Sequence, residues 1–262
     1  MTSPLSLTDS FYSLHHEIEI FERCFRSRLP LLLKGPTGCG KSQLVSYMAK
    51  KLELPLVKVA CNEDTSSADL LGRFLLKGSE MIWQDGPVTR AVRQGALLYL
   101  DELAEAREDV IVALHPLTDH RREIYLDRVN EVVSASNSFM CVASFNPGYQ
   151  KGFKELKPST RQRFINLVMT YLDRDTEVKL LCERTGLSED LSLKLIKLAE
   201  KIRNLSELNL RETVSTRLLV YAAILIRDGM NPRRACYSSI AEVLSDDPEV
   251  IQTLKDLVDL SL

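Results

Sequence analysis

The amino-acid sequence predicts an α/β fold with a parallel sheet, followed by a small helical domain. Five short apolar runs, separated by amphipathic stretches, occur in the first two-thirds of the chain, at residues 29–33, 55–60, 96–100, 139–143 and 164–169. Nearly continuous apolar runs of this length are typical of strands that are buried on both faces of a parallel sheet. Because helical patterns lie between the runs, we expect a layered α/β arrangement.

The last third of the chain has a helical pattern without strand-like runs. Residues 216–226 form one apolar helical stretch, and apolar residues recur at helical spacing before it, namely Leu191, Leu195, Leu198 and Ile202. Asn231-Pro232 and Asp247-Pro248 each place a capping side chain before a proline, which is typical of a helix start. We therefore expect one domain over residues 1–172 and a helical lid domain over residues 173–262, joined by a hinge.

Composition and charge exclude several classes of protein. The 262 residues carry 34 basic and 36 acidic side chains, and this balance argues against a dedicated nucleic-acid binder. No apolar run approaches the roughly 18–20 residues that span a bilayer, and residues 1–10 have no signal-peptide pattern. We expect a cytoplasmic protein with no membrane insertion. The six cysteines show no CxxC spacing, and His115 and His120 lack further ligands nearby, so no zinc site is indicated.

A phosphate-binding loop is the clearest local motif. Residues 35–42 match the pattern GxxxxGK[ST], after a predicted strand and before a predicted helix at residues 43–51. Glycines let backbone N–H groups surround a phosphate, and the helix N-terminus adds partial positive charge. Lys41 would reach the β- and γ-phosphates of a nucleotide, and Ser42 would bind Mg²⁺. The predicted nucleotide-binding residues of this loop are Gly35, Pro36, Thr37, Gly38, Cys39, Gly40, Lys41 and Ser42.

Two carboxylates follow the apolar run at residues 97–100. Asp101, at the end of this predicted strand, can hold Mg²⁺ through water, and Glu102 can polarise an attacking water. The adjacent glutamate favours hydrolysis over phosphate transfer onto a substrate. From the residues alone two alternatives stay open, a small-molecule kinase built on the same loop and a nucleotide-gated scaffold with negligible turnover.

Polar and basic residues further along the chain could complete the site. Asn146 ends the next predicted strand, where an amide can position water against the γ-phosphate, although Asn-Pro-Gly alone is more typical of a turn. Arg161 and Arg163 precede the last predicted strand, and Arg217 opens a predicted helix of the second domain. A single arginine is usually solvated or ion-paired. In a nucleotide switch it can also neutralise charge on the phosphoryl oxygens, in cis or from a neighbouring subunit.

The sequence contains four motifs in order: the phosphate loop, the two carboxylates, Asn146 and the arginines. In kind and order they resemble the motifs of the AAA+ ATPases. Residues 35–42 match the Walker A loop of that family and residues 97–102 its Walker B strand. Asn146 matches sensor 1, Arg163 the arginine finger and Arg217 sensor 2. Arg161 is the weaker finger candidate, because the family's finger normally lies directly before the phenylalanine of the last strand. The resemblance implies a P-loop αβα sandwich with a helical lid, which hydrolyses ATP to ADP and phosphate. The chain has no excess of basic over acidic residues, which disfavours a DNA-acting member of the family such as a helicase loader.

Further segments narrow the resemblance to the MoxR branch and, within it, to the CbbQ/NorQ/NirQ group. These segments are residues 59–64, 69–74, 83–87, 115–121, 145–150 and 159–164. From this resemblance over nearly the whole chain we expect a CbbQ-type subunit of a Rubisco activase.

The resemblance implies a homo-hexameric ring that remodels another protein at the expense of ATP. CbbQ proteins act with a larger partner of the CbbO type, which carries a von Willebrand factor A domain, and free Rubisco from inhibitory sugar phosphates. NorQ and NirQ proteins act with a NorD-type partner to activate nitric oxide reductase. This second target stays open as the alternative to Rubisco.

The resemblance also implies two insertions that form the working surface. One interrupts the helix after the second strand, at about residues 70–84, and the other is a β-hairpin at about residues 122–133. Ile124 and Leu126 alternate with polar neighbours, which favours a strand there. We expect Trp83 to anchor the first insertion against the body of the protein.

Overall fold

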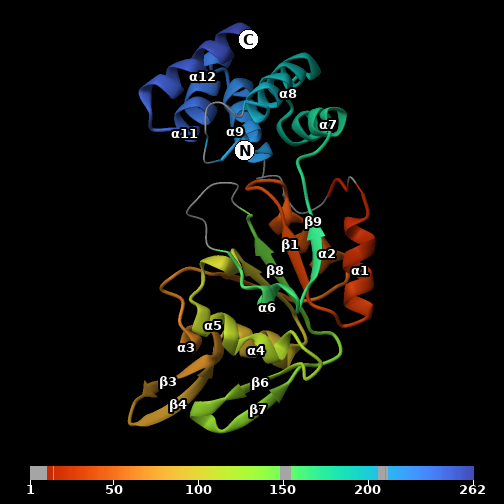
Figure 1. Ribbon diagram of the computed structural model, residues 1–262, viewed down its shortest axis with the longest axis vertical. Helices are drawn as coiled ribbons and strands as arrows, with labels where there is room; N and C mark the ends of the chain where they lie inside the picture. The colour runs from red at the N-terminus through yellow and green to blue at the C-terminus, as the bar shows by residue number, and fades with distance from the viewer. Residues whose placement is uncertain (1–10, 14, 148–154, 206–209, 211) are drawn as a thin grey trace.

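A five-stranded parallel sheet forms the centre of the N-terminal part of the protein (Figure 1). The computed structural model describes residues 11–13, 15–147, 155–205, 210 and 212–262. The strands lie in the order β2-β5-β8-β1-β9, and all neighbours are parallel. The five predicted strands are confirmed, with the bounds β1 Leu31–Lys34, β2 Leu56–Ala60, β5 Leu97–Asp101, β8 Met140–Phe145 and β9 Ile165–Val168.

Helices cover both faces of this sheet, as the continuous apolar runs predict. Leu31 and Leu33 of β1 pack with α1 and α2 on one face, whereas Leu32 packs with α4 and α5 on the other. Because successive side chains of a strand point to opposite faces, both faces of β1 are buried. The helices of this part are α1 Glu17–Arg26, α2 Lys41–Lys51, α3 Ser67–Leu71, α4 Pro87–Gln94, α5 Glu108–Ala113 and α6 Pro158–Arg161.

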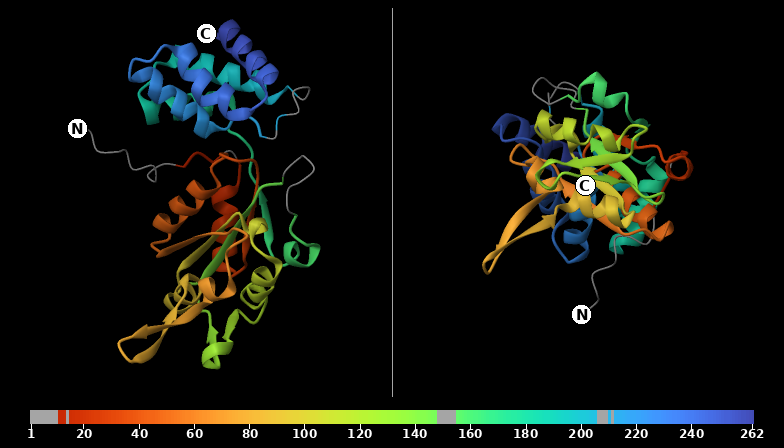
Figure 2. Two further views of the ribbon diagram at one scale, coloured as in Figure 1. Left: turned by 90° about the vertical axis from the view of Figure 1, so that its left-hand side faces the viewer. Right: turned by 90° about the horizontal axis from the view of Figure 1, so that it is seen from below.

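Two antiparallel hairpins extend from this part, at the end of the molecule away from the C-terminal helices (Figures 1 and 2). The strands of the first are β3 Gly72–Lys77 and β4 Glu80–Asp85, and those of the second are β6 Glu123–Leu126 and β7 Glu131–Ser134. The first hairpin therefore lies between α3 and α4, where the family resemblance implies an insertion. The second occupies residues 123–134, close to the expected 122–133.

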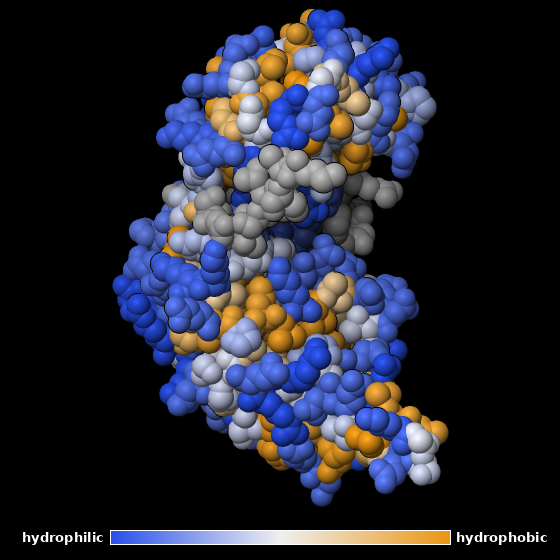
Figure 3. Space-filling model, turned by 180° about the vertical axis from the view of Figure 1, so that it is seen from behind, coloured by the Kyte–Doolittle hydropathy of each residue, from blue (hydrophilic) through white to orange (hydrophobic). Residues whose placement is uncertain are grey.

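The β3–β4 hairpin is anchored at its base and apolar at its tip. The Trp83 ring packs edge-on against Phe74, with 5.3 Å between ring centroids, and its Nε1 donates a hydrogen bond of 2.8 Å to Asp85. Trp83 also contacts the core between the sheet and α4. At the tip, Leu76 and Met81 are 75% and 68% exposed, and Figure 3 shows the hydrophobic surface that this hairpin forms.

The C-terminal part is a helical bundle with a core of its own. Its core includes Leu195, Leu198, Ala222, Ile240 and Leu254, all fully buried. Side chains cap two helices at the predicted positions, since Asn231 and Asp247 accept backbone N–H bonds there. In the described part of the chain no helix is long and apolar enough to cross a membrane. The helices are α7 Arg174–Thr185, α8 Glu189–Arg203, α9 Thr216–Arg227, α10 Pro232–Cys236, α11 Glu242–Leu244 and α12 Pro248–Ser261.

Candidate nucleotide-binding site

The loop between β1 and α2 has the backbone conformation of an anion-binding site. Gly40 is the N-cap of α2 with φ +99°, and Gly38 has φ +73°, so both lie where L-residues with side chains are strained. A Cβ on Gly38 would also lie only 2.5 Å from the Cβ of Ser215, at the start of α9. The loop thus presents its amides and the positive end of α2 close to the helical bundle.

Lys41 lies folded into this loop. Its Nζ donates hydrogen bonds of 2.7 and 2.8 Å to the carbonyl oxygens of Gly35 and Pro36. Burial lowers the pKa of the Lys41 ammonium from its ordinary value, and the nearby carboxylates of Asp101 and Glu102 oppose this shift. Phosphate oxygens could replace the two carbonyl partners, because they are stronger acceptors for an ammonium.

Asp101 and Glu102 lie at the end of β5, next to the loop. Ser42 Oγ lies 3.4 Å from Asp101 Oδ2, and the other carboxylate oxygen accepts hydrogen bonds from Tyr99 and Ser144. Tyr99 and Ser144 were not predicted as site residues, because Tyr99 counted only as an apolar position of the predicted strand and Ser144 as part of the strand before Asn146. The motif predicted the two carboxylates, and only the fold reveals the two hydroxyl groups that bond to Asp101.

The oxygen donors here fit Mg²⁺. Ser42 supplies a hydroxyl and Asp101 a carboxylate, and both are hard ligands of the kind that Mg²⁺ prefers. Mg²⁺ in nucleotide sites keeps several waters and takes phosphate oxygens, so one or two protein ligands suffice.

Asn146 follows β8 and contacts the phosphate loop directly. Its Nδ2 donates to Thr37 Oγ1 at 2.9 Å, and the Thr37 hydroxyl donates to Glu212 Oε1 at 2.6 Å. Asn146 Nδ2 also lies 3.4 Å from the same Glu212 oxygen. Glu212 comes from the segment before α9, and no motif predicted it. Residues 148–150 of the motif that follows Asn146 lie outside the described residues.

One cleft of about 440 Å³ brings most of the predicted site residues together. Lys41, Asp101, Glu102, Asn146 and Arg217 all line it, together with Thr37 to Ser42 of the loop. Arg217 lies on the wall formed by α9, opposite the loop. An apolar stretch of the cleft could accept a flat base, and its lining is Phe11, Tyr12, Leu172, Leu180, Val220 and Tyr221.

Arg163 and Arg161 do not line this cleft. Arg163 precedes β9, whereas the phosphate loop follows the parallel strand β1. The two therefore lie at opposite edges of the sheet, separated by a four-residue strand of roughly 13 Å. Arg163 pairs instead with Asp119 at 3.1 Å, and Arg161 lies 4.0 Å from Glu155. If either arginine contacts a nucleotide, that nucleotide belongs to another copy of the chain.

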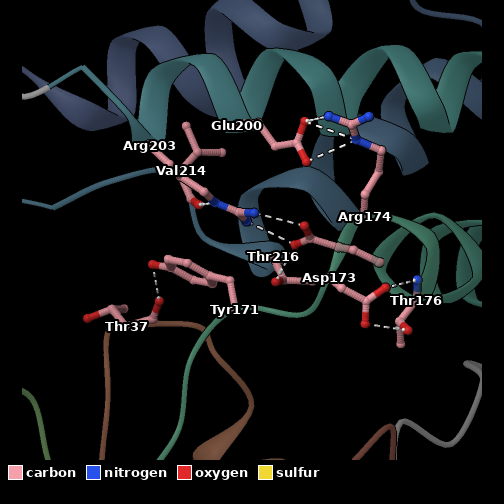
Figure 4. Close-up of polar contacts among 10 residues, drawn as sticks. Thr37, Tyr171, Asp173, Arg174, Thr176, Glu200, Arg203, Val214 and Thr216 are labelled. Atoms are coloured by element: carbon pink, nitrogen blue, oxygen red, sulfur yellow. Dashed lines mark hydrogen bonds and ion pairs between the residues drawn. The ribbon is translucent and has the colours of Figure 1, made fainter. Parts of the chain in front are cut away.

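A partly buried polar cluster joins the phosphate loop to the helical bundle (Figure 4). The Tyr171 hydroxyl donates to the Thr37 carbonyl at 3.0 Å, and the Arg203 guanidinium lies 4.1 Å from the centre of the Tyr171 ring. Arg203 also forms two bonds of 2.8 and 2.9 Å to Glu177, which accepts a third from Thr216 at the start of α9. These contacts would therefore transmit a displacement of the phosphate loop to α7, α8 and α9.

Comparisons of the sequence with known proteins show the family to which the chain belongs. Residues 30–164 match the AAA domain of the dynein-related subfamily, and residues 177–261 match the CbbQ/NirQ/NorQ C-terminal domain. The chain is 53% identical to the denitrification regulatory protein NirQ of Pseudomonas aeruginosa, over 97% of both chains. It is 54% identical to protein NorQ of Paracoccus denitrificans, over 92% of this chain and 89% of that one. It is 47% identical to protein CbbQ of Hydrogenophilus thermoluteolus, over 94% and 92%.

A solved structure shares the fold at low sequence identity. NtrX from Brucella abortus, solved in complex with ADP, superimposes with a TM-score of 0.59 at 13% identity, over 96% of this chain and 62% of NtrX. The AAA domain implies that this chain binds a nucleotide and hydrolyses ATP. The chain belongs to the AAA+ ATPases, in the group of CbbQ, NirQ and NorQ.

Proposed function

We propose that the cleft binds ATP with Mg²⁺ and that the side chains converging there carry out hydrolysis. The observation that carries this proposal is that Lys41, Asp101, Glu102 and Asn146 line one cleft beside the phosphate loop. Ser42, and Asp101 through a water, would hold Mg²⁺, which neutralises charge on the phosphate oxygens when bound.

Each side chain has a chemical task in this proposal. Lys41 exchanges its carbonyl partners for the β- and γ-phosphate oxygens. Glu102 accepts a proton from the attacking water, and Asn146 orients that water against the γ-phosphate. Arg217, on the α9 wall of the cleft, contacts the γ-phosphate. Loss of the γ-phosphate on hydrolysis therefore changes the position of the helical bundle.

We propose further that the complete site forms between copies of the chain in a homo-hexameric ring. Arg163 of a second copy would supply positive charge to the γ-phosphate, which is consistent with its position at the far edge of the sheet. Arg161 is the second candidate for this role. The ring is the arrangement that the family resemblance implies.

For the target we propose a nitric oxide reductase, activated together with a partner that carries a von Willebrand factor A domain. NirQ of Pseudomonas aeruginosa, a denitrification regulatory protein, and NorQ of Paracoccus denitrificans are 53% and 54% identical to this chain, against 47% for CbbQ. A second NirQ, from Stutzerimonas stutzeri, is 46% identical. Reactivation of Rubisco with a CbbO-type partner, the target expected from the sequence resemblance, is the second candidate because CbbQ is similar over nearly the whole chain.

Two substitutions test the assigned chemistry. Lys41→Ala should lose nucleotide binding, because the ammonium neutralises phosphate charge, whereas Glu102→Gln should bind ATP and retain it unhydrolysed. Binding is followed with a fluorescent ATP analogue and hydrolysis by phosphate release. Glu80→Gln, at the exposed hairpin tip, is the matched control and should behave as the unmutated chain. Hydrolysis at the normal rate by Glu102→Gln would remove this residue from the proposed role.

The target is tested by two reactivation assays run in parallel. Inactive nitric oxide reductase, and Rubisco blocked with ribulose bisphosphate, are each incubated with this chain, ATP, Mg²⁺ and the cognate von Willebrand-type partner. We expect recovery of nitric oxide reduction that requires both proteins and fails with Glu102→Gln. Recovery of carboxylation alone would instead establish the Rubisco target.

A further inference from the structure

Two hydroxyl groups lie buried beneath the cleft, on neighbouring strands of the sheet. Tyr99 of β5 is 1% exposed and Ser144 of β8 is fully buried. A buried hydroxyl without a partner costs free energy, so the partners of these groups show what the groups are for. Both donate a hydrogen bond to the same oxygen of Asp101, Tyr99 at 2.7 Å and Ser144 at 2.6 Å.

This pair of bonds fixes the orientation of the Asp101 carboxylate. Because Oδ1 accepts both donors, Oδ2 is the oxygen turned toward Ser42, at 3.4 Å from its Oγ. The Tyr99 hydroxyl also lies 3.1 Å from Ser42 Oγ, so it bridges the two proposed metal ligands.

Ser144 also holds the backbone at Glu102. Its Oγ accepts a 2.8 Å hydrogen bond from the Glu102 N–H while its own hydrogen goes to Asp101. Glu102 has φ +55° and ψ +48°, a left-handed conformation that residues with a Cβ rarely adopt. Such strain persists only where surrounding contacts hold it, and here it determines where the Glu102 side chain leaves the strand.

We propose that Tyr99 and Ser144 are positioning residues for ATP hydrolysis, with Tyr99 setting Asp101 against Ser42 and Ser144 setting the backbone of Glu102. The proposal rests on the proposed roles of Asp101 and Glu102. Neither Tyr99 nor Ser144 lines the cleft, so both act through other residues. If these hydroxyl groups only stabilised the core, their removal would not change kcat or the Mg²⁺ dependence of hydrolysis.

Ser144→Ala tests the bond to Glu102. We expect kcat to fall by about tenfold or more, as is usual when a group that orients an active-site ligand is lost. The Kd for ADP, measured without Mg²⁺, should stay unchanged, because the phosphate loop keeps all of its contacts. Ser239→Ala is the control, since Ser239 is a buried hydroxyl that donates to Ala235 O within the helical bundle.

Tyr99→Phe tests the contact with the metal ligands. The ring keeps its packing, so this variant decides the proposal even if Ser144→Ala does not fold. We expect the Mg²⁺ concentration for half-maximal hydrolysis to rise by about tenfold. The metal-free Kd for ADP and the melting temperature should change no more than in Ser239→Ala.

The Glu102→Gln variant distinguishes a failure of this proposal from a failure of the proposed roles of Asp101 and Glu102. If Glu102→Gln abolishes hydrolysis while both hydroxyl variants keep the normal kcat and Mg²⁺ dependence, the positioning roles are overturned and the site assignment stands. If the hydroxyl variants lose only thermal stability, the two groups belong to the core alone. If Glu102→Gln hydrolyses ATP normally, the underlying assignment fails and the positioning proposal fails with it.

Discussion

At the residue scale, Glu212 places a negative charge where phosphates are expected to bind. Its carboxylate accepts a hydrogen bond from Thr37 in the phosphate loop and lies close to the Asn146 amide. Like charges this close repel, so an incoming phosphate must displace the carboxylate or bind more weakly. Glu212 thus connects the segment before α9 to the phosphate loop.

Glu212→Gln should therefore bind ADP and ATP more tightly than the unmutated chain. A glutamine can still accept the Thr37 hydrogen bond, and the repulsion is removed. Calorimetric titration with ADP measures the change, and the gain should shrink at high salt because exposed charges are screened. Glu189→Gln, on α8 away from the cleft, should leave the Kd unchanged. Weaker binding by Glu212→Gln would mean that the carboxylate supports the nucleotide.

The sequence predicted the residues that belong to contiguous motifs and missed those that act across the fold. Lys41, Asp101 and Glu102 are recognisable because their spacing and flanking strands are local. Glu212 meets Thr37 over a separation of 175 positions, and Ser144 meets Asp101 over 43. Such partners depend on the strand order and on the placement of the helical bundle, which no local pattern specifies.

At the scale of elements, two arginine–glutamate pairs join α7 to α8 in different surroundings. The Arg203–Glu177 pair is buried, with side chains 13% and 1% exposed, whereas Arg174 and Glu200 are 50% and 32% exposed. Removing one partner of a buried pair leaves an uncompensated charge in the core. The exposed pair is solvated, and its loss has little effect on the free energy of unfolding.

Arg203→Met should therefore lower the free energy of unfolding by about 3–5 kcal/mol. Arg174→Met, the matched control, should lower it by about 1 kcal/mol or less. Denaturant unfolding followed by circular dichroism compares the two variants. Equal losses in both would contradict the idea that the Arg203–Glu177 cluster holds the helices against the loop.

The elements followed from the sequence more closely than the contacts between them. The apolar runs predicted all five strands within a few residues. The inner strands β5, β8 and β1 are buried on both faces and need an unbroken apolar segment, whereas the edge strands β2 and β9 are partly exposed. The insertion between α3 and α4 was placed by resemblance, and its hairpin was not visible in the pattern. Residues 74–76 and 81–83 are apolar on both faces, without the alternation that marks a half-buried strand.

At the scale of the whole molecule, the sheet separates the two parts of the proposed site. The cleft lies between the carboxyl ends of the parallel strands and the helical bundle, whereas Arg163 lies at the opposite edge of the sheet. A single copy therefore cannot bring Arg163 to its own nucleotide without unfolding. If Arg163 takes part in hydrolysis, the ATPase activity must depend on assembly.

Mixing two inactive variants tests most directly whether the ATP site is shared between copies of the chain. Lys41→Ala lacks a working phosphate loop but keeps Arg163, and Arg163→Ala binds ATP but lacks the arginine. We predict that neither variant hydrolyses ATP alone and that a mixture of the two regains hydrolysis, with most activity near equal amounts. Normal hydrolysis by Arg163→Ala alone, or inactivity at every ratio although the variants co-assemble, would contradict a site shared between copies of the chain.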